Sequence, residues 1–171
     1  MSFWDDMRRK KQIYEKDAGG EVSMARVLMS DGTSANLLYR AMRWSAKRGM
    51  KGPAYGFQYA NKVLNHCVIG MGADFGPGFV LLHPTGVVIN SKVKGGNNVA
   101  LESGVVIGDE KGVSPLLGDE IFVGSGAKIV GGVDVGNGAR VGANAVVVKS
   151  VEADQTVVGI PARPIARREN K

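Results

Sequence analysis

Apolar side chains recur at every sixth residue from Ile69 to Val147, and this spacing limits the fold more than any other feature. Stepping by six gives fourteen positions, all aliphatic or aromatic except one lysine: Ile69, Phe75, Leu81, Val87, Val93, Val99, Val105, Lys111, Leu117, Val123, Ile129, Val135, Val141 and Val147. An α-helix repeats its apolar stripe about every 3.6 residues, so a period of six excludes a helix here. A short strand and a sharp turn, repeated three times, instead carry the chain round a triangular prism whose coils stack as a solenoid. We therefore predict an all-β parallel β-helix.

The residues between these positions fit sharp turns. Gly follows the sixth-residue position in seven of the repeats, once after Lys111 and otherwise after an apolar residue, and a small side chain usually stands four places after that position. Gly relieves tight turns, and a small side chain fits beside the apolar one at a corner. The pattern fails across residues 108–115, a polar stretch with Gly and Pro, and resumes in phase at Leu117. We expect this stretch to leave the prism as a loop, where functional residues are common.

A short α-helical segment is predicted before the prism, from Ser34 to Lys47. Its apolar and small side chains lie on one side and its basic ones on another: Leu37, Leu38, Ala41, Met42 and Ser45 against Arg40, Arg43 and Lys47. The candidate N-caps are Ser30, Asp31, Thr33 and Ser34. Gly52–Pro53 would end the segment, and the first 21 residues read as a charged, poorly ordered arm. We expect an arm and amphipathic helix over 1–62, the β-helix over 63–160 and a basic tail over 161–171.

The net charge and the residue pattern limit the kinds of partner that this chain is expected to bind. The chain has 171 residues, a net charge of +6 and a pI near 9.5, but no RNA-binding signature or interleaving of basic and aromatic residues, so nucleic acid is not expected. The basic helix suits packing against the prism or a neighbouring copy, which we favour, or a peripheral membrane contact. Cys67 is the only cysteine, which gives no support to a disulfide-forming compartment, and no run of about 18 apolar residues is present. The cytoplasm is the expected location.

Several segments together resemble the hexapeptide-repeat acyltransferases, most closely the serine acetyltransferases and their polysaccharide-acetylating relatives. Leu82-His83-Pro84-Thr85-Gly86-Val87-Val88-Ile89 is similar to the family's catalytic strand. Residues 124–129 and 141–147 resemble its donor-site coils, and residues 158–164 resemble its Gly-x-Pro-Ala-Arg ending. The resemblance covers roughly residues 34–166 and implies that the β-helix is left-handed.

The resemblance also implies a chemistry. Transfer of an acetyl group from a thioester to a hydroxyl needs a base, a donor for the oxyanion and a site for the carrier. His83 matches the family's base, and a backbone N–H near Gly108–Asp109 would meet the oxyanion. Acetyl-CoA, the co-substrate, would lie in a groove between two prisms of a homotrimer, with no metal. The positions that match the donor site are Gly108, Asp109, Ser125, Arg140, Ala143 and Arg163.

The acceptor side departs from the serine acetyltransferase pattern. Where the family has Arg-His-Pro near the end of the loop, this chain has Val113-Ser114-Pro115. Ser114 is therefore the candidate acceptor contact. The loop is also about four residues shorter than in the family. Leu82 replaces the acidic residue before the histidine, and Val68 replaces the aspartate that steadies it. With a coil of about eighteen residues, Leu101 would stack over His83, so Glu102 is the candidate carboxylate partner; a solvated glutamate is the plain alternative.

The residues that would hold the ammonium and carboxylate groups of serine are missing from this chain. An acceptor with a neutral hydroxyl does not need them, so the sequence favours O-acetylation of a saccharide or a polysaccharide precursor. Two alternatives stay open, a serine O-acetyltransferase-like enzyme with a remodelled pocket and a non-catalytic trimeric scaffold. A zinc carbonic anhydrase on the same fold would need three histidines, and this chain has two, His66 and His83.

Overall fold

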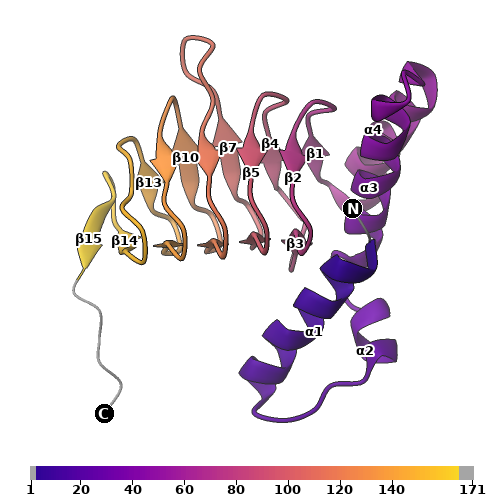
Figure 1. Cartoon of the computed structure of the whole chain (residues 1–171), viewed down its shortest axis with the longest axis horizontal. Coiled ribbons are helices and arrows are strands. Elements are labelled where there is room, and N and C mark those ends of the chain that lie inside the picture. The colour runs from indigo at the N-terminus through magenta and orange to yellow at the C-terminus, as the bar shows by residue number, and fades with distance from the viewer. Residues whose placement is uncertain (1–2, 166–171) are drawn as a thin grey trace.

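The computed structural model describes residues 3–165 and consists of a helical end joined to a three-sided prism (Figure 1). Four helices come first, and the chain then winds through short strands to the other end. The helices are α1 (Phe3–Ala18), α2 (Met24–Leu28), α3 (Thr33–Lys47) and α4 (Lys51–Asn65). No helix in this part of the chain is long and apolar enough to cross a membrane.

Fifteen strands of two or three residues form the three sides of the prism. They are β1 (Val68–Ile69), β2 (Asp74–Phe75), β3 (Val80–Leu81), β4 (Val88–Ile89), β5 (Lys94–Gly95), β6 (Ala100–Leu101), β7 (Val106–Gly108), β8 (Leu116–Leu117), β9 (Phe122–Val123), β10 (Lys128–Val130), β11 (Asp134–Val135), β12 (Arg140–Val141), β13 (Val146–Val147), β14 (Thr156–Val158) and β15 (Arg163–Ile165). Sheet A has the order β1-β4-β7-β10-β13, sheet B β11-β8-β5-β2, and sheet C β15-β14-β12-β9-β6-β3. All pairs are parallel except β14–β15, so the predicted parallel β-helix is confirmed.

The coils are less regular than a constant period of six suggests. The central inward residues of β3 and β4 are Leu81 and Ile89, which are eight residues apart, because the turn between them holds two extra residues. Between Ile107 of β7 and Leu117 of β8 the spacing is ten, because the loop adds four. The two residues added in the first turn and the four added in the loop together equal one six-residue repeat. Between the two insertions the residue two places before the central one can also be buried, as Val87 is before Ile89. The apolar period therefore continues through both insertions without a visible break.

The loop predicted over 108–115 is present, and it rises above the neighbouring turns (Figure 1). Glu110 and Val113 exchange both backbone hydrogen bonds, with N···O distances of 3.0 Å. Lys111 and Gly112 between them have φ values of 52° and 84°. These left-handed conformations match a two-residue hairpin turn, for which Gly is well suited.

The helical end differs from the prediction in three ways. The expected arm is the helix α1, α4 continues the helical segment beyond Gly52–Pro53, and the predicted boundary at 62/63 falls inside α4. At the other end, β15 lies within the predicted tail, while residues 166–171 are outside the described range. The N-cap of α3 is Gly32, whose φ is 78°, and none of the four proposed side chains caps the helix.

The buried face of α3 matches the predicted one only in part: Met42 and Ser45 are buried as expected, but Ala35, Asn36 and Tyr39 are buried beside them. Leu37 is half exposed, whereas Arg40 is buried and donates to both carboxylate oxygens of Asp6 at 2.7 and 2.6 Å. Arg43 forms an ion pair with Asp74 of β2 at 2.9 Å. These two basic side chains therefore bind the helical end to itself and to the prism. The helix packs against the prism, as favoured, and this use of its arginines gives no support to a membrane contact.

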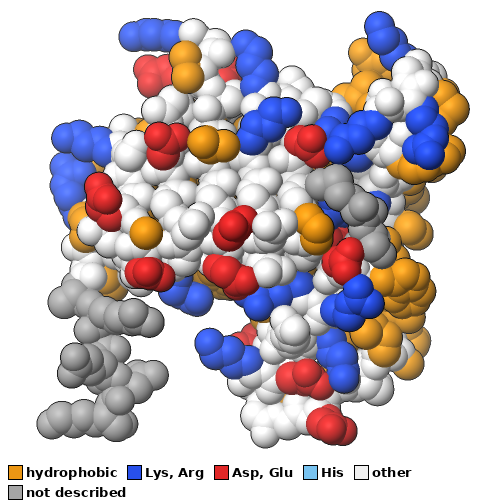
Figure 2. All heavy atoms as spheres, in the orientation of Figure 1, with side chains coloured by type: hydrophobic (Ala, Val, Ile, Leu, Met, Phe, Trp, Pro, Cys, Tyr) orange, Lys and Arg blue, Asp and Glu red, His pale blue; other side chains and the backbone are white. Residues whose placement is uncertain are grey.

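Aromatic rings close the first coil of the prism. Phe75 and Phe79 stack with centroids 4.2 Å apart, and Tyr39 of α3 meets Phe79 edge-on at 5.1 Å. The Tyr39 hydroxyl accepts from the Phe75 N–H at 3.0 Å, and burial raises the pKa of Tyr39 to about 12. Other large apolar side chains of the helical end are exposed rather than part of this core: Leu37, Trp44, Tyr55, Tyr59 and Leu64. Figure 2 shows hydrophobic side chains gathered over the helical end of the molecule.

Candidate functional site

The turns that join sheet C to sheet A stack into one long edge of the prism, which we call the His83 edge: residues 82–87, 102–105, 124–127 and 142–145. Each turn donates a backbone hydrogen bond to the turn below it. The bonds are Gly104 N–H to Thr85 O at 2.9 Å, Gly126 N–H to Ser103 O at 2.7 Å and Asn144 N–H to Ser125 O at 2.8 Å. The predicted donor-site residues Ser125 and Ala143 therefore lie on the same edge as His83, in successive coils above it.

His83 lies in the turn that holds the two extra residues, so its side chain leaves the prism and is about half exposed. Its Nδ1 is 3.3 Å from the Oδ2 of Asp31. Asp31 precedes Gly32 in the turn between α2 and α3, and this turn approaches β3 very closely. A Cβ on Gly32 would stand 1.9 Å from the carbonyl oxygen of Leu81, so the approach requires glycine. The close approach is what brings the Asp31 carboxylate to His83.

A cleft of about 330 Å³ opens beside this pair. Most of its polar lining comes from the α2–α3 turn (Ser30, Asp31), the end of α4 (Asn65, His66) and Thr85 of the His83 edge, while His83 itself lies outside the lining. His66 is the C-cap of α4, and its carbonyl accepts from the Gly86 N–H at 3.0 Å. The cleft is therefore built between the helical end and the turn that carries His83.

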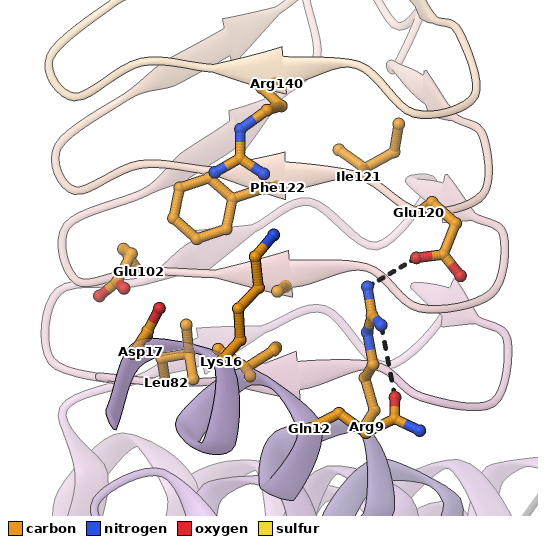
Figure 3. A pocket seen from close by; sticks show the side chains of 12 residues that line it. Arg9, Gln12, Lys16, Asp17, Leu82, Glu102, Glu120, Ile121, Phe122 and Arg140 are labelled. Carbon is orange, nitrogen blue, oxygen red and sulfur yellow. Dashed lines mark hydrogen bonds and ion pairs between the residues drawn. The ribbon is translucent and has the colours of Figure 1, made fainter. Parts of the chain in front are cut away.

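Glu102 is not the partner of His83. The coil here is twenty residues long rather than eighteen, so Leu101 pairs with Leu81 and Glu102 falls one residue short of the position above His83. Glu102 instead lines a cleft of about 410 Å³ between α1 and sheet C (Figure 3). The carboxylate beside His83 is that of Asp31, which the sequence indicates only as a candidate helix cap. The one signal was an Asp-Gly pair directly before a helix.

Arg140 lies in the same α1 cleft, which places it on a side of the prism rather than on the His83 edge (Figure 3). Its guanidinium carbon is 4.5 Å from the centre of the Phe122 ring. Arg163 is exposed on β15 and donates only to the carbonyl of Ala162, at 3.1 Å. Arg140 therefore lies over an aromatic ring in this cleft, and Arg163 lies exposed near the far end of the prism.

The residues predicted at the loop lie on a different edge, between sheets A and B. Asp109 accepts from the side-chain amide of Asn90 at 2.7 Å, and the Ser114 hydroxyl lies 3.5 Å from the Asn90 amide oxygen. Gly108 ends β7 at the base of the loop. One chain therefore does not bring Gly108, Asp109 or Ser114 together with His83. The two groups meet only if the loop edge of one copy faces the His83 edge of another.

Within residues 3–165 no three His, Cys, Asp or Glu side chains are grouped as a metal site would need. Cys67, the single cysteine, is buried against the first coil, and burial raises the pKa of its thiol to about 12. It is therefore an inert core residue.

A parallel β-helix with an exposed histidine on one edge and a hairpin loop on the next is the arrangement expected of a hexapeptide-repeat acyltransferase, and the comparisons with known proteins agree with it. Serine acetyltransferase of Mycobacterium tuberculosis is 31% identical over 159 residues, which are 91% of this chain and 69% of that protein. The enzyme of Helicobacter pylori strain J99 is 31% identical over 92% of this chain and 94% of its own length. The chain belongs to the serine acetyltransferase family. No protein-family model matches it.

Solved structures agree with this assignment. Serine acetyltransferase from Brucella abortus superposes with a TM-score of 0.86 at 32% identity, over 95% of this chain and 67% of that one. A serine acetyltransferase in complex with CoA gives a TM-score of 0.84 at 28% identity, over 96% of this chain and 70% of that one. The chain spans about two thirds of the length of several of these relatives. Because they are serine acetyltransferases, they favour the serine-like alternative over the saccharide acceptor that the sequence favoured.

Proposed function

We propose that this protein transfers an acetyl group from acetyl-CoA to the hydroxyl of serine or a serine-like small molecule, with His83 as the general base. The observation that carries the proposal is the contact of His83 with Asp31, on the edge that also holds Ser125 and Ala143. A histidine beside a carboxylate, in a turn open to solvent, has the arrangement expected of a base.

In the proposed reaction, His83 Nδ1–H donates to Asp31, which leaves Nε2 to take the proton of the acceptor hydroxyl. The hydroxyl oxygen then attacks the thioester carbonyl, and the C–S bond breaks as the new C–O bond is kept. The leaving sulfur takes the proton from His83, so the products are the acetyl ester and free CoA. The pantetheine arm would run along the small residues of the His83 edge, with Arg140 and Arg163 toward its phosphates.

The proposed active unit is a homotrimer, because one prism separates the loop from His83. Sheet A offers the contact side. Its outward residues are mostly valine, namely Val68, Val88, Val106 and Val146, with Lys128 between the last two, and Val88 is 41% exposed. Sheet B presents the charged Asp74, Lys94 and Asp134 outward, together with the apolar Leu116. Packing of sheet A against the next copy buries the valines and brings a neighbour's loop toward the His83 edge. A cytoplasmic location, where acetyl-CoA is available, remains part of the proposal.

One observation keeps a neutral acceptor as a second candidate. The cleft beside His83 contains the Asp31 carboxylate but no Lys or Arg among its lining residues, and the loop ends in Val113-Ser114-Pro115. A serine carboxylate would therefore need a cation from outside the cleft, whereas a saccharide hydroxyl would not.

The test is thiol release from acetyl-CoA against serine, free sugars and nucleotide sugars, with wild type, His83→Ala and His66→Asn. His66→Asn removes the only other imidazole and suits the left-handed backbone at that position (φ 49°). Serine-dependent turnover that is lost in His83→Ala supports the proposal; because His66 lines the cleft, His66→Asn is expected to change the KM for the acceptor without removing the base. Turnover with a sugar alone would select the second candidate. Binding of CoA without turnover by any acceptor would select the non-catalytic scaffold.

A further inference from the structure

Lys10 is a buried lysine whose ammonium group reaches the turn that carries Asp31. It lies on α1 with no exposed surface, and its Nζ donates to the backbone carbonyl of Asp31 and to the Thr33 hydroxyl, the latter at 3.2 Å. The Thr33 hydroxyl in turn donates to the Val27 carbonyl at 2.8 Å. The ammonium therefore joins α1, the end of α2 and the start of α3 at one point.

The helix that follows this turn, α3, is bound to the strand before His83 by a separate residue. The Asn36 side chain donates to the Phe79 carbonyl at 2.7 Å and accepts from the Leu81 N–H at 3.0 Å. Asn36 thus fixes the body of α3 to β3, whereas Lys10 contacts the turn itself, at the residue whose carboxylate meets His83. Among the described residues, Lys10 is the side chain that donates to the Asp31 backbone.

Burying a charged group at this position costs desolvation free energy that packing alone would not require. Burial lowers the pKa of Lys10 to about 8, partly opposed by the charge of Asp31. An apolar side chain of similar length would fill the same space without the desolvation of an ammonium. What an apolar side chain cannot do is donate to two oxygens of the turn.

We propose that Lys10 is a positioning residue for the His83–Asp31 pair, holding the turn between α2 and α3 so that the Asp31 carboxylate stays against His83. The inference rests on the proposed function for its catalytic consequence, but the contact it describes can be tested without turnover. It also gives α1 a role in the site although α1 itself does not touch His83.

The test compares Lys10→Met with Arg9→Met. Arg9 is the neighbouring residue on α1 and pairs with Glu120 at 2.6 Å, so its variant loosens α1 from the prism without touching the turn. We expect Lys10→Met to lower acceptor kcat/KM by on the order of 10–100-fold, to leave the KM for acetyl-CoA unchanged and to speed hydrogen exchange at the amides of residues 30–33. Arg9→Met should do none of these.

A double-mutant cycle with Asp31→Asn separates positioning from a general structural role. If Lys10 acts through Asp31, the double variant should be no slower than the slower single variant. Additive losses, or an equal loss in Arg9→Met, would overturn the inference. Should Lys10→Met not fold, Thr33→Val removes one of the two acceptors and should give a smaller loss with the same pattern.

Hydrogen exchange keeps this inference distinct from the proposed function. If the wild type acetylates no acceptor, the proposed function fails, and exchange in the turn still decides whether Lys10 holds it. Unchanged exchange in Lys10→Met overturns the positioning role whether or not the enzyme is active.

Discussion

Gly32 is the residue on which the geometry beside His83 depends most directly. It combines a φ of 78° with an approach to the Leu81 carbonyl that leaves no room for a side chain. Its neighbour Asp31 could not be recognised as the partner of His83 from sequence, because the two are 52 residues apart and the contact is made by this turn. His83 itself was found readily, since its motif is local.

Replacing Gly32 with alanine should therefore damage both stability and the site. We expect the free energy of unfolding to fall by about 2 kcal/mol or more, and Asp31 to move away from His83 with a loss of acceptor kcat. Gly49→Ala is the matched control, because Gly49 has a φ of 75° but nothing within 4 Å of its added Cβ. Equal losses of activity in the two variants would contradict the close-approach explanation; denaturant unfolding and steady-state rates measure both effects.

The buried side chain of Lys10 should make the stability of the protein depend on pH. Its pKa of about 8 lies below the ordinary 10.5, so between these values the unfolded chain binds more protons than the folded one. Stability therefore rises with pH across this window through Lys10. The groups that face it are Asp31 from the turn and Tyr14 on α1, whose ring centre is 5.6 Å away.

The measurement is denaturant unfolding of wild type and Lys10→Met at pH 8 and pH 10.5. Titrations shared by both proteins, such as that of Cys67, cancel in the comparison. From pH 8 to pH 10.5 the unfolding free energy of wild type should rise relative to that of Lys10→Met by on the order of 3 kcal/mol. A difference that does not change with pH would contradict the lowered pKa.

At the scale of elements, the sequence predicts the prism well and the helical end poorly, for a physical reason. Every strand except β5 and β15 buries an apolar residue at a fixed place, whereas α1 buries Asp6, Met7 and Lys10, and α4 buries only Ala54 and Asn61. Helices held by buried polar contacts lack the apolar stripe that periodicity detects. The insertions at the two edges stayed hidden because they sum to one repeat.

The attachment of α1 is testable through its buried ion pair. Asp6 is fully buried against Arg40, which also donates to the Phe75 and Gly76 carbonyls at 3.0 and 2.7 Å. Asp6→Ala leaves a buried guanidinium without its carboxylate, so the free energy of unfolding should fall by about 3–5 kcal/mol. Asp5→Ala, which removes an exposed pair with Arg8, should change it by less than about 1 kcal/mol. Thermal unfolding of the two variants distinguishes them, and a small loss in Asp6→Ala would show that α1 is held by other contacts.

At the scale of the whole molecule, the prediction concerns assembly. Val88→Glu places a carboxylate on the apolar side of sheet A, where three copies would bury it. We expect this variant to run as a monomer in light scattering and to lose acetyl transfer. Lys94→Glu introduces the same side chain on sheet B and should leave the oligomer intact. A trimeric Val88→Glu would mean that sheet A is not the contact side.

Both ends of the prism are closed. At one end the rings of Tyr39, Phe75 and Phe79 fill the opening under α3. At the other end, β15 runs antiparallel along β14. The Val146 carbonyl accepts a hydrogen bond from the Ala162 N–H, and the Val146 N–H donates to the Gly159 carbonyl. Parallel coils with open ends would act as templates for further coils and invite growth into a filament. With both described ends occupied, the solenoid presents no bare coil to a second copy, so growth by end-to-end stacking of coils is blocked.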